Sequence, residues 1–344
     1  MCCLFGIIDY KNKIGYKERK RILRNLSICG EERGTDAAGI AFNSSGKLNV
    51  IKYGVPAHCL KYNLPRDTFV VMGHNRLATQ GSADKVYNNQ PFQGVSGNNK
   101  FAFAHNGIIY NDKLLRKELN LPDTKIETDS FIAVQLIENK GAFDIDAIKY
   151  AAENVEGSFC FTFIDSEDSI YIVKGNNPMV VFDYKFLGIC VYASTAEILK
   201  KAVNKSILKK QAYEEIKIGR GEIIKINRFG EREHFNFDTK KLDNGIYSYG
   251  GMYGSIYDDY MWDIYSGVLS KGYKYNDDEY KYDEKNTLYS QLVEYGSYAG
   301  VSEDEILFLL ENGFDCWEIE EMLMEPEVVR QYIEEIAYVQ GYYV

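Results

Sequence analysis

Short apolar runs alternate with amphipathic windows from residue 2 to about residue 237, and this alternation restricts the fold more than any other feature of the chain. Runs rich in Val, Ile and Phe predict β-strands at 4–8, 38–42, 68–72, 101–104, 159–164, 169–173 and 222–226. Windows with helical spacing and end signals predict helices at 17–29, 112–119 and 130–138. Such a strand-rich mixture predicts an α+β fold in which sheets pack face to face with helices outside.

The composition changes after about residue 238. From Tyr247 onward the chain holds 17 of its 28 tyrosines, and the stretch 247–282 has no sustained period. Helical spacing returns near residue 302 and predicts helices at 305–310, at 316–324 and to about 339. We expect three parts: a domain over 2–238, a Tyr- and acid-rich linker or arm over 239–299, and a small helical module over 300–344 that can dock a partner.

Length, hydropathy and charge exclude several classes of protein. A chain of 344 residues can form one large domain with a smaller one attached. It has no uninterrupted apolar run of 18 residues and no basic start followed by an apolar stretch. Neither a membrane span nor a secretory signal is therefore expected, and the expected location is the cytoplasm. The net charge of −10 argues against a nucleic-acid surface, which needs clustered Lys and Arg.

The cysteines do not indicate a metal site. Their number is odd, their spacing contains no CxxC pair, and only four histidines accompany them. A zinc site or a disulfide framework is therefore not expected, and no cofactor is predicted.

Cys2 is a candidate nucleophile because only Met1 precedes it. A small second residue favours enzymatic removal of Met1, which would leave a thiol and a free α-amine on the same residue. The unperturbed amine titrates near about 7.7–8.0 and the thiol near about 8.5, so the amine can accept the thiol proton near neutral pH. A cysteine at this position is also common without any function, so position alone does not decide.

Two motifs near predicted strands carry cationic side chains. Arg33 opens the segment 33–39, Arg-Gly-Thr-Asp-Ala-Ala-Gly, which taken alone is a turn with an ion pair. The segment 73–81, Gly-His-Asn-Arg-Leu-Ala-Thr-Gln-Gly, follows an apolar strand. The guanidinium of Arg76 can hold a carboxylate bidentately, and the hydroxyl of Thr79 can add a third hydrogen bond. A structural ion pair is the alternative for Arg76, and His74 fits a packed, hydrogen-bonded histidine.

Two further motifs carry polar groups. Asn106-Gly107 follows another apolar strand, and an amide beside a glycine N–H offers two donors to a developing oxyanion. Asn-Gly is also a common turn dipeptide. Asp129 lies in Glu127-Thr128-Asp129-Ser130 at a predicted helix start, where an acidic residue either compensates the helix dipole or holds an ammonium group.

Taken in order, these motifs resemble those of class II glutamine amidotransferases, which are N-terminal-nucleophile hydrolases. The start Cys-Cys-Leu-Phe-Gly resembles their Cys-Gly-Ile-Phe-Gly. Further similarities lie at 33–40, 73–81, 89–92, 104–107 and 128–130, with weaker ones at 155–159, 193–197 and 220–223. The resemblance covers residues 2 to about 227 and implies a four-layer αββα sandwich.

The resemblance implies catalytic roles for three residues. Cys2 corresponds to the nucleophile, with its own α-amine as the base, and Asn106 with the Gly107 N–H corresponds to the oxyanion hole. The implied reaction releases ammonia from the side chain of glutamine and hydrolyses a γ-glutamyl thioester to glutamate. The family usually has Gly after the nucleophile, whereas this chain has Cys3, which turns into the core, narrows the pocket or reacts with an oxidised Cys2.

The resemblance also implies how glutamine is held. Arg76, helped by Thr79, corresponds to the residue that binds the α-carboxylate of glutamine, and Asp129 to the residue that binds its α-ammonium. Arg33 is expected to order the loop around Cys2, and His74 is expected to support the site.

The acceptor of the ammonia is not indicated, because no synthase signature is visible after residue 238. The expected partner is a separate synthase subunit or a second copy of the chain, held through the carboxyl-terminal region. Two other functions stay open: an N-terminal-nucleophile amidase for another small amide, and a non-catalytic amidotransferase-like scaffold that binds partners.

Overall fold

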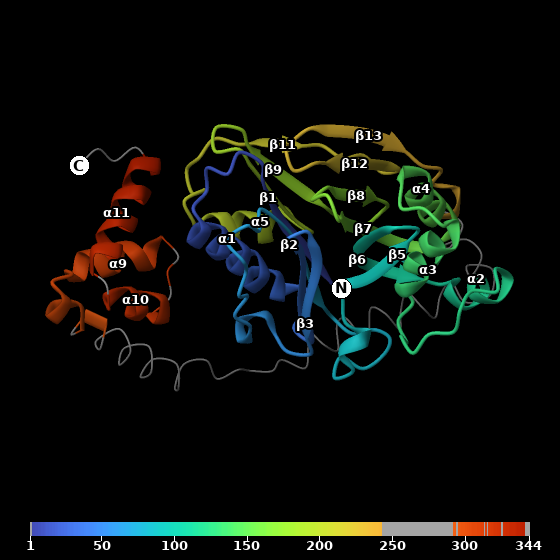
Figure 1. Cartoon of the computed structure of the whole chain (residues 1–344), viewed down its shortest axis with the longest axis horizontal. Coiled ribbons are helices and arrows are strands. Elements are labelled where there is room, and N and C mark those ends of the chain that lie inside the picture. The colour runs from blue at the N-terminus through green and yellow to red at the C-terminus, as the bar shows by residue number, and fades with distance from the viewer. Residues whose placement is uncertain are drawn as a thin grey trace, which may run out of the picture. The chain divides into compact units, whose positions relative to one another are not determined.

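Two antiparallel sheets form the centre of the part of the chain between residues 2 and 242 in the computed structural model (Figure 1). The strands described are β1 (Cys3–Asp9), β2 (Ala37–Ser44), β3 (Lys47–Tyr53), β4 (Val70–Arg76), β5 (Phe92–Ser96), β6 (Asn99–Ile109), β7 (Gly157–Asp165), β8 (Ile170–Lys174), β9 (Val180–Tyr184), β10 (Ile189–Ala193), β11 (Glu214–Ile216), β12 (Glu222–Ile226) and β13 (Arg232–Asn236). One sheet has the order β11-β9-β10-β1-β4-β2-β3, and the other has the order β13-β12-β8-β7-β6-β5.

Helices cover the outer face of each sheet. The helices of this part of the chain are α1 (Tyr16–Cys29), α2 (Asp112–Glu118), α3 (Phe131–Lys140), α4 (Ile145–Asn154) and α5 (Ala196–Val203), with short turns η1 (Gly30–Glu32), η2 (Ala57–Cys59) and η3 (Val86–Asn88). Helices α1 and α5 lie on the seven-stranded sheet, and α3 and α4 lie on the six-stranded sheet (Figure 1). The predicted α+β, four-layer αββα sandwich is confirmed.

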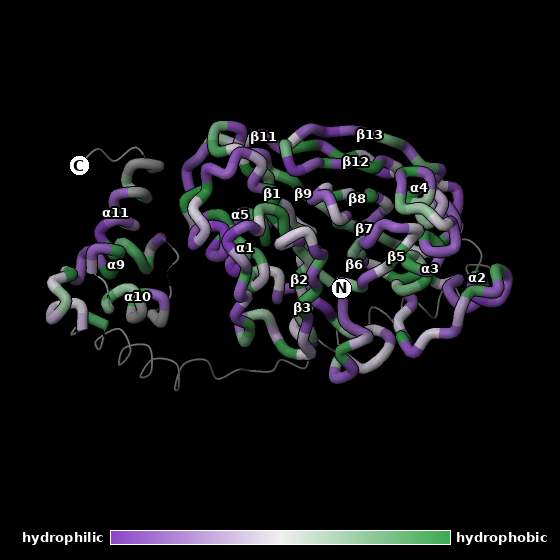
Figure 2. Tube along the Cα trace, in the orientation of Figure 1, coloured by the Kyte–Doolittle hydropathy of each residue, from purple (hydrophilic) through white to green (hydrophobic). Residues whose placement is uncertain are grey.

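Apolar side chains fill the space between the two sheets. Leu4 and Met72 of one sheet pack there with Ala102 and Ala104 of the other. Because successive strand residues point to opposite faces, every second residue of β1, β4 and β6 reaches this inner layer. Figure 2 shows hydrophobic stretches within the sheets and a largely hydrophilic β13, which lies at the edge of its sheet.

A second core lies between the six-stranded sheet and α3 and α4, and phenylalanines dominate it. The Phe163 ring is fully buried, with its centroid 4.9 Å from that of Phe103 and 6.0 Å from that of Phe143. Aromatic rings bury large apolar areas, so this cluster is a major stabilising contribution to the layer.

A buried pair of histidines joins the sheets near one end. His74 on β4 donates through Nε2 to the main-chain oxygen of His105 on β6, at 3.1 Å. Both residues are almost fully buried. Burial lowers the pKa of His74 to about 3, and burial also lowers the pKa of His105. Both imidazoles are therefore neutral at pH 7.

The predicted elements of this region are all present, and several others were not predicted. The strand signals missed are those of β3, β5, β9, β10, β11 and β13, and the helices missed are α4 and α5. The start signals of both helices are in the sequence: the side chain of Asp144 accepts from Ala147 N, and that of Thr195 accepts from Ile198 N.

The structure describes residues 2–242, 292–293, 295–312, 314, 316–324 and 326–340, and the chain divides into two units, Met1–Gly245 and Ile246–Val344. Most of the predicted arm at 239–299 lies outside the described residues. The second unit contains α9 (Glu303–Glu311), α10 (Cys316–Leu323) and α11 (Pro326–Gln340), where three helices were predicted. No helix in these described ranges has both the length and the apolar character needed to span a membrane.

Replacing Phe163 by Ala should lower the free energy of unfolding of the first unit by about 3–5 kcal/mol, because a buried ring leaves a cavity. Phe186→Ala is the matched control, since Phe186 is 78% exposed and should change stability by less than about 1 kcal/mol. Denaturant unfolding of both variants measures the difference. Equal losses in the two variants would contradict the burial of Phe163.

Acid should destabilise the contact at His74. Its folded-state pKa of about 3 lies below the unfolded value of about 6.5. Between these values the unfolded chain binds a proton that the folded chain does not, so stability falls as pH decreases. His74→Asn should therefore reduce the slope of unfolding free energy against pH between 6 and 4 by up to about 1.4 kcal/mol per pH unit. An equal reduction in a control variant of the exposed His58, His58→Asn, would contradict this cause.

Candidate active site

Three strand ends meet around Cys2. β1 pairs with β4 in a register that sets Cys3 opposite Asn75, so Cys2 lies beside Arg76, the last residue of β4. β2 flanks β4 on its other side and sets Ala37 opposite Arg76. The candidate nucleophile and the candidate carboxylate-binding cation are therefore neighbours on adjacent strands.

The alternation of side chains directs these groups to the inner layer. Leu4 and Met72 point between the sheets. Cys2 lies two residues from Leu4, and Arg76 lies four residues from Met72, so both side chains face the same way. In the facing sheet Ala104 points inward, and Asn106 follows it by two residues. The two sheets thus present the candidate nucleophile, cation and oxyanion donor toward the space between them.

The thiol of Cys2 is partly exposed and weakly bonded. Its Sγ lies 3.7 Å from the main-chain oxygen of Leu77, and the Nε of Arg33 donates to the main-chain oxygen of Cys2 at 2.9 Å. Burial raises the pKa of the Cys2 thiol, against the smaller lowering effects of the Leu77 backbone and Arg76. A base is therefore needed to form the thiolate near neutral pH.

Cys3 points to the opposite face of the sheet. It is fully buried, and its Sγ lies 3.1 Å from where a Cβ on Gly30, at the end of α1, would stand. The side chain therefore belongs to the layer between the sheet and α1 and does not share the face of Cys2.

Asn106 is fully buried, and neither polar atom of its side-chain amide has a hydrogen-bond partner among the described residues. Its main-chain oxygen, by contrast, accepts from Asn177 Nδ2 at 2.7 Å. A buried amide without partners costs about 1–3 kcal/mol, and the Asn106 side chain keeps its hydrogen-bonding groups available for a group that enters the site.

Gly107 cannot be replaced without strain. Its φ is +149°, and a Cβ would stand 1.9 Å from the main-chain oxygen of Ser158. Glycine at this position lets β6 and β7 approach closely, which holds the Asn106-Gly107 pair in place.

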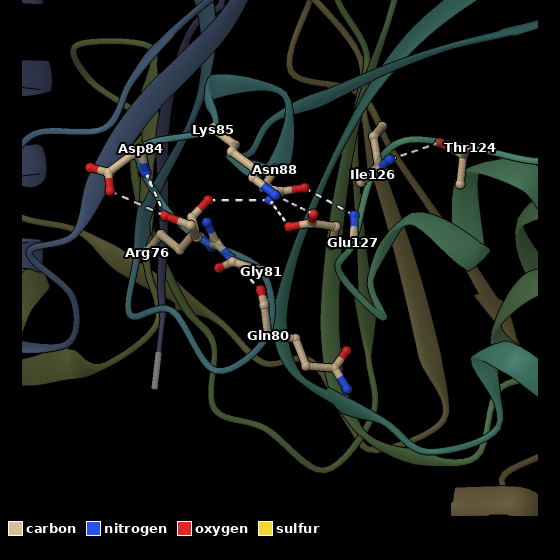
Figure 3. A network of polar contacts seen from close by, with 10 residues as sticks. Arg76, Gln80, Gly81, Asp84, Lys85, Asn88, Thr124, Ile126 and Glu127 are labelled. Carbon is tan, nitrogen blue, oxygen red and sulfur yellow. Dashed lines mark hydrogen bonds and ion pairs between the residues drawn. The ribbon is translucent and has the colours of Figure 1, made fainter.

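The Arg76 guanidinium is held by its own loop. Nη1 donates to Asn89 Oδ1 at 2.7 Å, and Nη2 donates to the main-chain oxygens of Gly81, at 2.8 Å, and of Gln80. Figure 3 shows the guanidinium beside the loop that carries Gln80 and Gly81. Thr79 lies exposed in this loop.

Asp129 lies just before α3, where it contacts β6. Its Oδ2 accepts from the main-chain N–H of Ile109 at 2.6 Å, and its Oδ1 accepts from the Ser130 hydroxyl at 3.3 Å. The residue is 4% exposed. Next to the larger effect of burial, the negative charge of Asp129 acts to raise the pKa of both Cys2 and Arg76, so the three groups lie close enough to interact electrostatically. A buried cation and a buried anion near a thiol can bind the charged ends of a free amino acid.

Several groups of the site were not predicted from the sequence. Asp36 accepts from the Ala78 N–H at 2.7 Å and so anchors the loop after β4. Lys52 donates to the main-chain oxygens of Asn89 and Pro91, and burial, followed by the charge of Arg76, lowers the pKa of Lys52 to about 8. Asp36 lies in the motif at 33–40, and the oxygens that Lys52 bonds lie in the motif at 89–92, but neither motif suggested these roles.

Comparison with known proteins gives one family match within this unit. The family model described as "Glutamine amidotransferase domain" matches residues 74–201, which include the end of β4 and the whole of β6 and α3. Two curated relatives are the glutamine--fructose-6-phosphate aminotransferases (isomerizing) of Streptococcus pyogenes, 32% identical over 190 residues, and Lactococcus lactis, 33% identical over 192 residues. Each alignment covers 53% of this chain and 30% of the relative. The chain thus spans about a third of the length of these relatives.

The fold also has a counterpart among solved structures. The glutamine phosphoribosylpyrophosphate amidotransferase from B. subtilis matches with a TM-score of 0.55 and 22% identity, over 70% of this chain and 50% of that chain. This likeness concerns the fold alone. Residues 74–201 match a glutamine amidotransferase domain, and the chain shares its fold with a solved amidotransferase.

Proposed function

We propose that this chain releases ammonia from the side-chain amide of glutamine, with Cys2 as the nucleophile, and that the ammonia passes to an acceptor on another domain or protein. The observation that carries the proposal is the buried amide of Asn106, which lacks a partner among the described residues and lies on the inner face that Cys2 and Arg76 also face. The match to a glutamine amidotransferase domain supports it.

The proposed reaction has two halves. With Met1 removed, the α-amine of Cys2 takes the thiol proton, and the thiolate attacks the amide carbon of glutamine. The Asn106 amide and the Gly107 N–H stabilise the oxyanion, each donor contributing about 2.7–4 kcal/mol. The protonated amine then gives its proton to the leaving ammonia. Water attacks the γ-glutamyl thioester, and glutamate and the free thiol result.

Selection of glutamine rests on its two charged ends. We assign the α-carboxylate to Arg76, with Thr79 as an additional donor, and the α-ammonium to Asp129. A peptide-internal amide lacks both charges, so it would leave a buried cation and a buried anion unpaired, at a cost of several kcal/mol. Arg33 is assigned to hold the start of β1 through the main-chain oxygen of Cys2, and neutral His74 to support the sheets behind the site.

The paired charges also bear on the two alternatives. An amidase for an amide without an amino-acid head group would have a substrate that offers no charged groups to Arg76 and Asp129. A non-catalytic scaffold would gain no stability from the buried side-chain amide of Asn106, which lacks a hydrogen-bond partner in the described part of the chain. Both alternatives predict no release of glutamate from glutamine.

The acceptor and the partners stay predictions. The names of the curated relatives specify fructose-6-phosphate, but the chain spans 30% of their length, and that substrate is not carried over. We propose that residues 2–238 perform the glutamine chemistry. The part at 239–299 would act as a linker, and the helical module at 300–344 would dock a synthase or a second copy. The cytoplasm remains the expected location.

Cys2→Ala should lower glutamate release from glutamine by at least about 10³-fold, because the nucleophile is lost. Cys59→Ala is the control, since Cys59 is an exposed free thiol outside the site. Intact mass must first establish that the protein assayed begins at Cys2. If processed wild-type protein with candidate partners releases no glutamate, the proposal is wrong.

Asp129→Asn should raise the KM for glutamine by about 10- to 100-fold, because a hydrogen bond to a charged group is worth about 1.5–3 kcal/mol. The fold should survive, since the new side chain keeps an oxygen for the Ile109 N–H. Steady-state kinetics and Tm measure the two effects, with Asp67→Asn, an exposed loop carboxylate, as the control. A KM equal to that of wild type would remove Asp129 from the site.

A further inference from the structure

Asn88 and Glu127 exchange hydrogen bonds at the edge of the site (Figure 3). Asn88 Nδ2 donates to Glu127 Oε2 at 2.8 Å, and the Glu127 main-chain N–H donates to Asn88 Oδ1 at 2.9 Å. Asn88 is fully buried, whereas the side chain of Glu127 is 42% exposed. Because each residue both donates and accepts, the pair fixes the distance and the orientation of two chain segments.

The first of these segments is the loop 77–88, which holds Arg76. The guanidinium donates to the main-chain oxygens of Gln80 and Gly81. Asn88 closes this loop, because its Nδ2 also donates to the main-chain oxygen of Ser82 at 3.2 Å. The position of Asn88 therefore determines where the carbonyl groups that orient Arg76 lie.

The second segment, 124–129, ends at Asp129. Glu127 precedes Asp129 by two residues, and the Asp129 main-chain N–H donates to Gln80 Oε1 at 3.1 Å. The loop thus contacts the guanidinium of Arg76 through its carbonyl groups and the main chain of Asp129 through the side chain of Gln80. The Asn88–Glu127 pair is a second connection between the same two segments.

We propose that Asn88 and Glu127 are positioning residues that set the spacing between Arg76 and Asp129, and thereby the selectivity of the site for a free α-amino acid. This inference rests on the proposed function. The carboxylate and ammonium of an amino acid share one carbon atom, so their separation is fixed. We call Arg76 and Asp129 together the clamp. If one of these two side chains is misplaced by about 1 Å, much of the binding energy for the amino acid is lost.

The exposed ion pair beside Glu127 offers a matched control. Lys85 Nζ also forms an ion pair with Glu127, but the side chain of Lys85 is 47% exposed and that of Glu127 is 42% exposed. Exposed ion pairs contribute little to the stability of a fold. The Glu127 pKa is lowered by the hydrogen bonds from Lys85 and Asn88, so the carboxylate is charged at neutral pH. Placing a second carboxylate at position 88 therefore creates repulsion where there was a hydrogen bond.

The test compares Asn88→Asp, the double variant N88D/E127Q and Lys85→Gln in the full chain that begins at Cys2. Asn88→Asp should raise the KM for glutamine by about tenfold, with kcat changed by less than about threefold. In the double variant the amide introduced at position 127 donates to the carboxylate introduced at position 88, but the bond to the Ser82 oxygen stays lost. The KM should therefore fall at least about threefold below that of Asn88→Asp without reaching the wild-type value. Lys85→Gln should leave the KM unchanged.

A second readout separates positioning from loss of structure. Iodoacetamide alkylates Cys2 without using the clamp, so its rate should be the same in all variants. If Asn88→Asp does not fold, Glu127→Ala replaces it, since Glu127 is exposed, and the same rise in KM is expected.

An unchanged KM in Asn88→Asp, or in Glu127→Ala where that variant replaces it, would overturn the inference and leave the proposed function standing. A double variant no better than Asn88→Asp would do the same. Wild-type protein that alkylates normally but releases no glutamate would overturn the proposed function and the inference together.

Discussion

The pairing of β1 with β4 sets the position of everything else in the site. The register that places Cys3 opposite Asn75 brings the candidate nucleophile beside Arg76 and turns its side chain toward the facing sheet. A slip of one residue would reverse the faces, so that Cys3 pointed inward. On β6, in the facing sheet, the same alternation that places Ala104 in the inner core directs Asn106 inward. The active-site geometry is thus a consequence of sheet register.

Electrostatics then decides which groups can act as acids or bases. Burial lowers the pKa of His74 and of His105, so neither imidazole takes up a proton readily at pH 7. Burial also raises the pKa of the Cys2 thiol. The α-amine of a processed chain, carried on the same residue, is therefore the base that we propose.

The sequence allowed the layers to be predicted, because strands with strong apolar runs and helices with clear end signals were found. The ordered motifs indicated Cys2, Arg76, Asn106 and Asp129, and the roles of these four residues stay predictions. Short strands such as β11 were missed because pairing with a neighbouring strand, and not local composition, forms them. The Asn88–Glu127 contact joins residues 39 positions apart, and no local pattern predicts it. The orientation of Cys3 became clear only with the register of β1.

The most direct test of the central claim is to trap the covalent intermediate. Processed protein is mixed with glutamine, quenched in acid within the first turnover, digested and measured by mass spectrometry. We predict an added mass of one glutamyl group on the peptide that begins with Cys2. Release of glutamate with no adduct on that peptide, or with an adduct on another cysteine, would contradict the assignment of Cys2 as the nucleophile.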